Sequence, residues 1–450
     1  MLRERSLHAV EAELQRVGRS IHAAMPGRSR HPLRALDQKA MGLASQDQQL
    51  RAALFRFVDV TPACRNLDDL ARHLSAYLEE VGGRPPPIEA AMRMSGTKAG
   101  RAALGAAAAA GVRHMAHRFI VGETPKAAVR TIRQLWESGA AVSLDLLGEA
   151  TVTQAEADRY AARCMDALET LAEAAPRWPS RPALEADSLG PLPRVNLSVK
   201  VSALSPLLRP EAPDVGRDDA ARRMRPLLVR AKELGAHLHI DMESVDTLEA
   251  TLDLVVEMLD EPELRDGPST GVVMQAYLRE SPDQLERVIE WARATDRRPP
   301  LVVRLVKGAY WDHEVVEARQ HGWTPPVFEQ KAESDRNFEA LTLRLLEAWP
   351  HVRPAIASHN LRSVAHAVAA NRAAGREDRD LELQVLRGLG DDLAAALASH
   401  GMRVRIYCPV GDMVAGMAYL VRRLLENTSN ESFLGEQQRG VPIEELLAAP

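Results

Sequence analysis

Cysteine is scarce in this sequence: there are three residues in 450, Cys64, Cys164 and Cys408. Thiols so few and so far apart argue against a disulfide framework or a zinc cluster, and they favour a reducing, cytoplasmic setting. Long apolar runs are lacking too, since no stretch reaches the roughly 20 residues of a membrane span, and the opening MLRERSLHAVEAEL is too charged for a signal peptide. Any membrane contact is therefore expected to be peripheral.

Basic residues are not in excess either. The formal net charge is -5, and both signs are spread along the chain, whereas a nucleic-acid binder usually concentrates basic residues on one surface. No GxGxxG follows an early strand, which disfavours a Rossmann domain. Ser, His and Asp show no nucleophile-elbow spacing, so acyl transfer has no support.

The sequence does contain a change near residue 140, from purely helical patterns to short strands that alternate with helices. Residues 1–135 read as a helical arm, and residues 177–193, rich in proline and polar residues, read as a loop. Eight short β-type runs then alternate with helical stretches, which predicts an α/β fold, a (β/α)₈ barrel over residues 136–435 with a tail at 436–450. A doubly wound open sheet is the alternative. The predicted strands are 141–147, 195–201, 237–242, 271–276, 301–306, 354–358, 381–386 and 403–407.

Several of these strands carry polar residues at every second position. Because strand side chains alternate between faces, the polar set would line the barrel interior while the apolar set packs on the helices. Charges are costly to bury unpaired, so such an interior should be an ion-paired cavity that holds a ligand. An antiparallel sheet with one wet face is the competing interpretation. The polar set comprises Ser143, Asp145, Glu149, Asn196, Ser198, Lys200, Ser202, His237, His239, Asp241, Glu243, Glu382, Gln384, Arg403, Arg405 and Tyr407.

Active sites of such barrels lie at the carboxyl ends of the strands. Two runs there suggest chemistry. HLHIDME (237–243) offers a His-x-His pair, as in metal-dependent barrel hydrolases, although structural histidines are favoured and no metal is predicted. In VVRLVKGAYWDHE (302–314), Gly308 and Ala309 permit close backbone approach and Tyr310 and Trp311 offer flat faces, which suits a planar cofactor.

A helical run near the end of the chain carries a double positive charge, Arg422 and Arg423. At about 100° per residue these arginines share a face with Ala415, Tyr419 and Glu426. Taken alone, this pattern is typical of a surface helix with a solvated charged side.

Together, these motifs resemble the proline dehydrogenase part of the bifunctional proline-utilisation flavoenzymes, over most of residues 35–435. The motifs occur in the family's order. They are VDV (58–60), LDLLGEA (144–150), LSVKVSAL (197–204), HIDME (239–243), MQAY (274–277), RLVKGAYWDHE (304–314), SHN (358–360), LQVLRGLG (383–390), RIYCPVG (405–411) and YLVRRLLENTSNESF (419–433).

The resemblance implies a distorted barrel that holds FAD non-covalently and oxidises L-proline to Δ1-pyrroline-5-carboxylate by hydride transfer to flavin N5. It implies a last helix over the barrel mouth, where Arg422 and Arg423 would bind the proline carboxylate together with Lys200. Asp241 would partner Lys200, and Glu149 would pair with Arg422 to close a gate. The residues that would wall the pyrrolidine ring are Tyr310, Leu386, Tyr407 and Tyr419.

For the cofactor, the resemblance implies that Arg304 contacts the flavin near N5 and that Gln275 bonds the ring edge. Glu329 departs from the family, whose members tend to have a small hydroxyl residue there. The full set implied for FAD is Asp241, Met242, Gln275, Arg304, Val306, Lys307, Gly308, Ala309, Tyr310, Trp311, His359, Asn360, Glu426 and Phe433.

The expected electron acceptor is a membrane quinone, reached by peripheral docking at the inner face of the membrane. A separate Δ1-pyrroline-5-carboxylate dehydrogenase would oxidise the product, and no nucleic-acid partner is expected. A metal-dependent hydrolase and a non-catalytic scaffold on the same barrel are the alternatives.

Overall fold

A computed structural model describes residues 2–25, 47–83, 86–148, 151–412, 416 and 441–450. The chain divides into two compact units. One contains Met1–Met25, Pro125–Val410 and Ile443–Pro450, and the other contains Pro26–Thr124 and Gly411–Pro442. These units group residues that contact one another and do not test the predicted domain boundaries at 135 and 435, which stay predictions.

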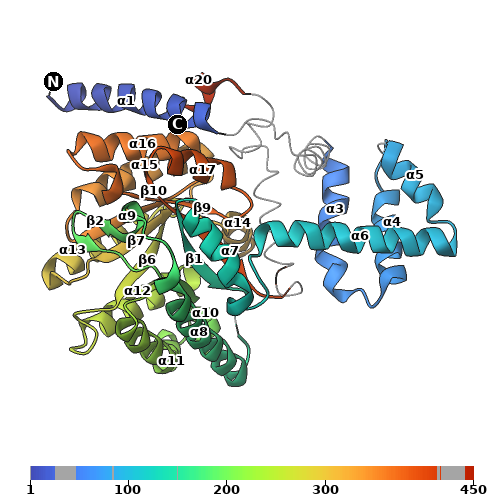
Figure 1. The fold of residues 1–450 in the computed structure, drawn as a ribbon, viewed down its shortest axis with the longest axis horizontal. Helices are drawn as coiled ribbons and strands as arrows, with labels where there is room; N and C mark the ends of the chain where they lie inside the picture. Colours follow the sequence, from blue (N-terminus) through green and yellow to red (C-terminus); the bar gives the residue numbers. More distant parts are fainter. Residues whose placement is uncertain (1, 26–46, 84–85, 149–150, 413–415, 417–440) are drawn as a thin grey trace. The chain divides into compact units, whose positions relative to one another are not determined.

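The first unit is built around a closed barrel of eight parallel strands (Figure 1). The chain order of the strands is also their order around the barrel, and the ring closes where the first strand, β1, pairs with the last, β10, with Ser143 opposite Tyr407. All eight predicted strands are therefore confirmed, and the open-sheet and antiparallel alternatives are wrong. The strands are β1 (Ala140–Leu146), β4 (Asn196–Lys200), β5 (His237–Asp241), β6 (Ser269–Gln275), β7 (Leu301–Val306), β8 (Val352–Ala357), β9 (Glu382–Leu386) and β10 (Arg403–Val410).

Helices surround the barrel, and their ends follow local capping rules. Thr153 and Glu156 form a capping box that starts α8, and Asn360 accepts the N–H of Ser363 to start α16. The helices are α7 (Pro125–Glu137), α8 (Gln154–Ala174), α10 (Val201–Leu204), α11 (Pro213–Glu233), α12 (Val245–Asp260), α13 (Ser281–Thr295), α14 (Trp311–His321), α15 (Lys331–Glu347), α16 (Leu361–Ala373) and α17 (Asp391–Ser399).

The barrel interior is polar and ion-paired, as the alternation predicted. Arg405 binds both carboxylate oxygens of Glu382, at 2.8 and 2.9 Å, and both residues are buried. Burial alone would raise the pKa of Glu382, but the neighbouring arginines, Arg405 first, lower it well below its usual range.

A short hairpin meets the amino-terminal ends of the strands. It consists of β2 (Ala186–Asp187) and β3 (Gly190–Pro191), preceded by α9 (Pro182–Glu185). Asp187 is buried and accepts bonds of 2.9 and 3.0 Å from Arg353 and of 3.2 Å from Arg403. The prediction of a plain loop over 177–193 is therefore wrong in part. The Pro-rich composition gave no indication that Asp187 pairs with two buried arginines.

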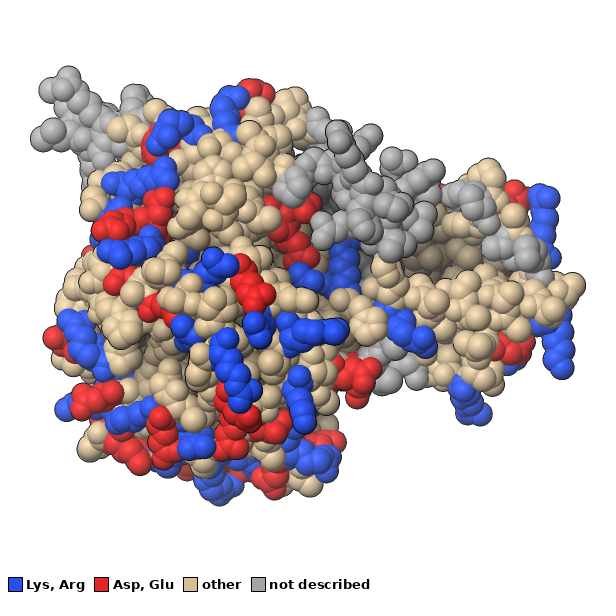
Figure 2. Space-filling view, in the orientation of Figure 1, with Lys and Arg blue, Asp and Glu red and all other residues tan. Residues whose placement is uncertain are grey.

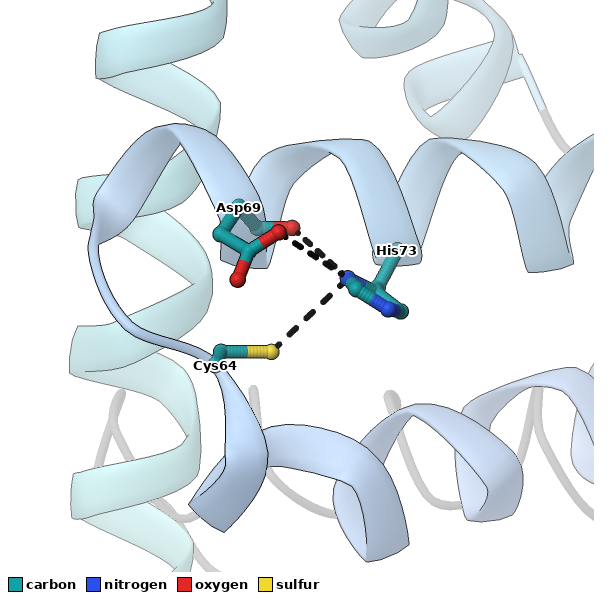
Figure 3. A group of neighbouring side chains, drawn as sticks. All are labelled: Cys64, Asp69 and His73. Carbon is teal, nitrogen blue, oxygen red and sulfur yellow. Dashed lines mark hydrogen bonds and ion pairs between the residues drawn. The ribbon is translucent and has the colours of Figure 1, made fainter.

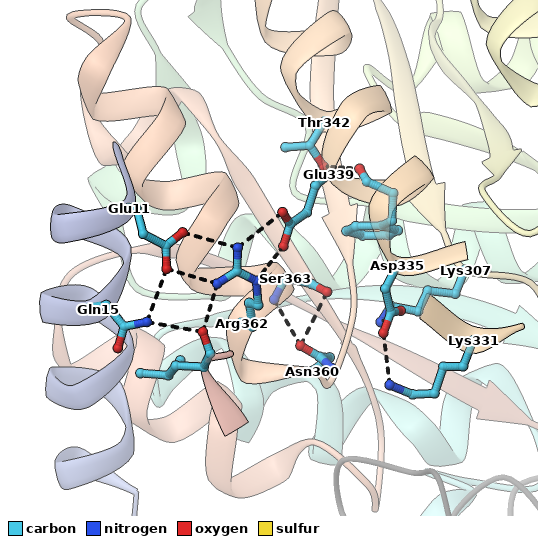
Figure 4. Close-up of polar contacts among 12 residues, drawn as sticks. Glu11, Gln15, Lys307, Lys331, Asp335, Glu339, Thr342, Asn360, Arg362 and Ser363 are labelled. Carbon is cyan, nitrogen blue, oxygen red and sulfur yellow. Dashed lines mark hydrogen bonds and ion pairs between the residues drawn. The ribbon is translucent and has the colours of Figure 1, made fainter. Parts of the chain in front are cut away.

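The long helix α1 (Leu2–Ala24) packs on α16, beside the short helix α20 (Ile443–Leu446). Arg362 of α16 joins these parts (Figure 4). Its five N–H groups donate to Glu11 of α1, Glu339 of α15 and the carbonyl oxygen of Leu447, over 2.7 to 3.3 Å. One buried guanidinium thus connects both ends of the chain to the outer layer of the barrel.

The second unit is helical in its described part, which agrees with the predicted helical arm (Figure 1). A Cβ on Gly105 of α6 would lie 2.0 Å from the carbonyl oxygen of Leu67, so glycine there permits close packing of α6 on α4. The elements are α3 (Gln48–Val60), the 3₁₀ turn η1 (Thr61–Ala63), α4 (Leu67–Glu79), α5 (Pro86–Met94) and α6 (Lys98–Phe119).

The surface carries charges of both signs. Figure 2 shows Lys and Arg intermixed with Asp and Glu on the visible face of the barrel unit, as the sequence indicates. Among the described helices, none combines the length and the hydropathy that crossing a membrane requires.

Candidate active site at the carboxyl ends of the barrel strands

Asp241, the last residue of β5, is the centre of a hydrogen-bonded cluster at the carboxyl end of the barrel. Arg304 of β7 donates to one carboxylate oxygen at 2.5 Å, and the Tyr407 hydroxyl of β10 donates to the other at 2.6 Å. The Arg304 guanidinium also lies 5.3 Å from the centre of the Tyr407 ring. Three strands far apart in the sequence are thereby joined, and the alternation had placed two of the three side chains, Asp241 and Tyr407, inside the barrel.

Tyr407 is held in its neutral form. Burial, with the charges of Asp145 and Asp241, raises the pKa of its hydroxyl well above the usual value. The hydroxyl therefore acts as a hydrogen-bond donor over the whole working pH range.

Lys200, the last residue of β4, forms its ion pair with Asp145 of β1, which is 1 % exposed. The predicted partner, Asp241, is not the residue that Lys200 bonds, and its two oxygens accept instead from Arg304 and Tyr407. Burial disfavours the lysine charge, but the attraction of Asp145 and Asp241 outweighs burial and raises the Lys200 pKa. The site therefore holds a fixed ammonium group.

Gln275 and Glu243 lie beside this cluster. The Gln275 amide nitrogen donates to the Glu243 carbonyl oxygen at 3.0 Å, and the Glu243 carboxylate accepts from Ser202. Burial raises the pKa of Glu243. Sequence reasoning placed Glu243, Asp145 and Ser202 in the polar lining of the barrel but assigned none of them a contact with substrate or cofactor.

The segment after β7 holds the predicted cofactor contacts. Gly308 has a φ of 131°, and a Cβ there would lie 2.4 Å from the Tyr277 ring, so the turn needs glycine. Lys307 forms an ion pair with Asp335, whose other oxygen accepts from Lys331 at 2.8 Å (Figure 4). Burial lowers the pKa of Lys307, and Asp335 opposes this effect. Asp335 and Lys331 were missed because they belong to α15, outside the strand ends.

The other predicted cofactor residues in the described chain also follow strands. His359 accepts the N–H of Leu386 at its Nε2, at 2.9 Å, which places the ring proton on Nδ1. Asn360 uses its side-chain oxygen to cap α16. Trp311 donates to the carbonyl oxygen of Phe328 at 2.9 Å. Predicted site residues that also end or follow the barrel strands are Met242, Val306, Ala309, Tyr310 and Leu386.

Six predicted site residues lie outside the described residues: Glu149, Tyr419, Arg422, Arg423, Glu426 and Phe433. The predicted gate, the last helix and the double-arginine contact with a carboxylate therefore stay predictions.

The described residues fit a flavin. Gln275 Oε1, an acceptor, and Arg304 Nε, a donor, are buried without a hydrogen-bond partner among the described residues. Buried polar atoms are usually paired, so both are suited to bind the polar edge of a ligand. Lys307 and Gly308 directly follow β7, which carries Arg304, and Gln275 is opposite the last residue of that strand, Val306, on the neighbouring β6. Such a donor and acceptor set suits a ring with carbonyl and N–H groups along its edge.

The His-x-His pair does not form a metal centre with the described residues. His237 bonds Ser269 at 2.8 Å and His239 at 3.1 Å. His237 is the first residue of β5, at the opposite end of the strand from the candidate active site. Burial and Arg405 lower the His237 pKa to about 3. Within the described chain, three metal-ligating side chains come together only at Cys64, Asp69 and His73, in the helical unit. The hydrolase alternative therefore loses its ligand set.

Comparison with known families gives two matches. The family model described as "Proline dehydrogenase" matches residues 128–436, and "Proline utilization A N-terminal domain" matches residues 11–119. The second match places the helical arm in a known domain type, which the sequence interpretation had not done.

Individual relatives agree. The bifunctional protein PutA of Salmonella typhimurium is 33% identical over 75% of this chain and 25% of its own length. Proline dehydrogenase 1 of Bacillus subtilis subsp. natto is 28% identical over 73% of this chain and 92% of its own. The crystal structure of PutA from Bdellovibrio bacteriovorus inactivated by N-propargylglycine superposes with a TM-score of 0.89 and 34% identity, covering 98% of this chain and 44% of that one. The chain thus spans about a quarter of the length of the PutA relatives it matches.

Proposed function

Because this chain belongs to the proline dehydrogenase family, in its proline utilization A form, we propose that it oxidises L-proline to Δ1-pyrroline-5-carboxylate with FAD. The observation that carries the proposal is the cluster of Asp241, Arg304 and Tyr407 beside the Lys200–Asp145 pair. Lys200 offers a fixed positive charge for a small carboxylate. Arg304 offers a second positive charge, and its Nε atom, with Gln275 Oε1, is available to the polar edge of a flavin.

When bound, FAD supplies the hydride acceptor at N5. We assign the cofactor to Gln275, Arg304 and the Lys307–Trp311 segment, with His359 and Asn360. Arg304, positively charged and buried, would favour negative charge near the ring. The protein thereby contributes orientation and electrostatics, and the redox chemistry belongs to the cofactor.

Lys200 would bind the proline carboxylate, with Arg422 and Arg423 as further cationic partners. The Tyr407 and Leu386 side chains, at neighbouring strand ends, would limit the space around the pyrrolidine ring. Asp241, fixed through both oxygens, would orient Arg304 and Tyr407 without moving during turnover.

Hydride leaves proline more readily when the ring nitrogen is neutral, so kcat/KM is expected to rise toward alkaline pH. Lys200 stays charged over this range because its pKa is raised. A 4-hydroxyl would project toward Tyr407, so hydroxyproline is expected to be a poor substrate. Equal turnover of the two substrates would contradict this assignment.

The visible spectrum tests the whole proposal. The purified, FAD-loaded protein should be yellow and should bleach when proline is added without oxygen, and alanine serves as the control amino acid. A colourless protein that gains activity with divalent metal would support a hydrolase, and a protein with neither response would be a scaffold.

We also propose a membrane quinone as the electron acceptor and a Δ1-pyrroline-5-carboxylate dehydrogenase activity as the next step for the product. Anaerobic turnover with a soluble quinone, measured against turnover with oxygen alone, tests the acceptor. Equal rates with the two would count against the quinone.

A further inference from the structure

Three side chains of different chemistry converge in the helical unit, which contains none of the described residues assigned to the flavin. Cys64, Asp69 and His73 present a sulfur, a carboxylate oxygen and an imidazole nitrogen that all lie within 4.8 Å of one another (Figure 3). We propose that this group binds one zinc-class divalent cation. The proposal does not depend on the activity of the barrel.

The local fold brings the three together. Asn66 caps α4 by accepting the N–H of Asp69 at 2.9 Å, so the chain turns sharply between Cys64 and the helix. Asp69 and His73 are four residues apart in α4 and therefore share one face. Cys64 directly follows the η1 turn and approaches that face from the side (Figure 3).

The distances approach those of a tetrahedral site. Cys64 Sγ lies 3.9 Å from His73 Nδ1, and His73 Nδ1 lies 3.7 Å from Asp69 Oδ1. Zinc bonds of about 2.0–2.3 Å at tetrahedral angles separate neighbouring ligand atoms by roughly 3.3–3.8 Å. These two distances are within a few tenths of an ångström of that range, and all three atoms lie within 4.8 Å of one another. Side-chain shifts of at most about 1 Å would therefore complete the arrangement, with water in the fourth position.

The ligand types select the class of ion. A thiolate with an imidazole and one carboxylate suits zinc and its neighbours in the first transition row, while magnesium and calcium prefer oxygen alone. All three side chains are at least partly accessible in the described structure, so an ion can enter.

The three side chains already make hydrogen bonds, some of which metal coordination would replace. His73 Nδ1 lies 3.0 Å from the Asp69 carbonyl oxygen, and the Cys64 thiol donates to the Val60 carbonyl oxygen at 3.5 Å. Asp69 also accepts from the Arg65 N–H at 3.2 Å and from Arg72 at 3.4 Å. Coordination would give up the His73 and Cys64 contacts, moving the ring proton to Nε2. One S–H bond breaks, one zinc–sulfur bond forms, and one proton passes to solvent.

Sequence reasoning missed this group because it counted cysteines alone. Three thiols so far apart exclude a cysteine-rich cluster, but a mixed site needs only one. The spacing Cys-x₄-Asp-x₃-His is the signal that could have found it.

The test uses the full chain without an affinity tag, stripped of metal by chelator. Cobalt is titrated first, because tetrahedral cobalt–thiolate has visible bands and a near-ultraviolet charge-transfer band, and zinc is then added to displace it. We expect one equivalent of cobalt and full displacement by one equivalent of zinc. Separately, zinc added to the metal-free protein should release about one proton.

Cys64→Ser should abolish the charge-transfer band, and Cys64→Ser, Asp69→Asn and His73→Ala should each weaken zinc binding at least about tenfold. His117→Ala, at an exposed histidine of α6 in the same unit, is the matched control and should bind as the parent does. Circular dichroism of the metal-free variants verifies folding. The proposal is overturned if the parent protein binds no cobalt in tetrahedral form, or if folded Cys64→Ser and His73→Ala bind zinc as tightly as the parent.

Discussion

Asp145 sets how firmly Lys200 keeps its proton. Asp145→Asn removes the bonded anion, so less attraction opposes the effect of burial and the Lys200 pKa falls, with Asp241 and Glu243 as the remaining anions. A neutral lysine cannot bind a carboxylate, and the variant should therefore lose affinity as pH rises, by about 10–100-fold at the alkaline limit. The measurement is the Kd of a proline analogue that keeps the carboxylate and lacks the amine, followed by flavin absorbance from neutral to alkaline pH.

Lys200→Met provides the comparison, since it should be weak at every pH. The parent protein should show almost constant affinity because the raised pKa keeps Lys200 charged throughout. Identical pH profiles for the parent and Asp145→Asn would show that another group carries the charge.

Tyr407 links β10 to Asp241 through one hydroxyl. Tyr407→Phe keeps the ring and removes the 2.6 Å bond to the carboxylate. Hydrogen bonds to charged groups contribute about 1.5–3 kcal/mol, so kcat/KM for proline should fall roughly 10–100-fold while bound flavin is retained. Steady-state kinetics measures the loss, and the absorbance ratio of flavin to protein is the control. An unchanged kcat/KM would show that the Tyr407 hydroxyl is not needed to position Asp241.

At the scale of elements, β5 contains a histidine that the fold keeps neutral. The unfolded chain protonates His237 below about pH 6.5, while burial and Arg405 lower the folded pKa to about 3. Stability is therefore lost as pH falls through this window, by up to about 1.4 kcal/mol per pH unit. In His237→Asn this contribution is absent, so the stability gap between parent and variant should narrow from pH 7 to pH 4. Denaturant unfolding at each pH measures the gap, and parallel curves would contradict the assignment.

The turn after β7 tests whether backbone approach matters to the cofactor. Gly308→Ala introduces a Cβ 2.4 Å from the Tyr277 ring at a φ of 131°. Gly322, at the end of α14, has a φ of 70°, and a Cβ added there would meet nothing within 4 Å, so it isolates the backbone strain. Gly322→Ala should cost about 1 kcal/mol of stability and retain flavin.

Gly308→Ala should cost more stability than its control and should weaken FAD binding at least about tenfold, because the clash moves the segment that follows Arg304. Flavin release during dialysis and thermal unfolding of both variants measure the two effects. Equal flavin retention in the two variants would exclude this turn from the cofactor site.

At the scale of the whole molecule, the barrel was predictable because alternation survives in its strands. In β4 and β5, polar residues alternate with apolar ones, and this alternation shows which face of each strand points into the barrel. Eight strands separated by helices are the number that closes a barrel. The resemblance to known motifs added an expected role for each site residue without any coordinates, but the described residues do not include the helix predicted to carry Arg422 and Arg423.

Partnerships across the barrel were not predictable. Lys200 pairs with Asp145 because β1 and β4 are neighbouring strands of the barrel, with Asp145 opposite Ser198. Asp187 binds Arg353 and Arg403 from a hairpin whose composition reads as a loop. Both depend on which strands become neighbours, and residues so distant in sequence give no local signal of it.

Arg362 contacts three separate parts of the barrel unit, so its loss should weaken all three. It is 8% exposed and uses all five N–H groups, so Arg362→Ala leaves two carboxylates and a carbonyl without their cation. We expect a loss of about 3 kcal/mol in the free energy of unfolding. Glu11→Gln is the control: Glu11 is 45% exposed and its substitution should cost under about 1 kcal/mol. Denaturant unfolding checks both, and equal losses would show that the central guanidinium is not special.

A single guanidinium binds Glu11 and the Leu447 carbonyl at once, so loosening of the opening helix removes one of the contacts that fix the closing turn. Their backbone amides are expected to exchange with deuterium at linked rates, and a disturbance at one extremity of the polypeptide should be felt at the other.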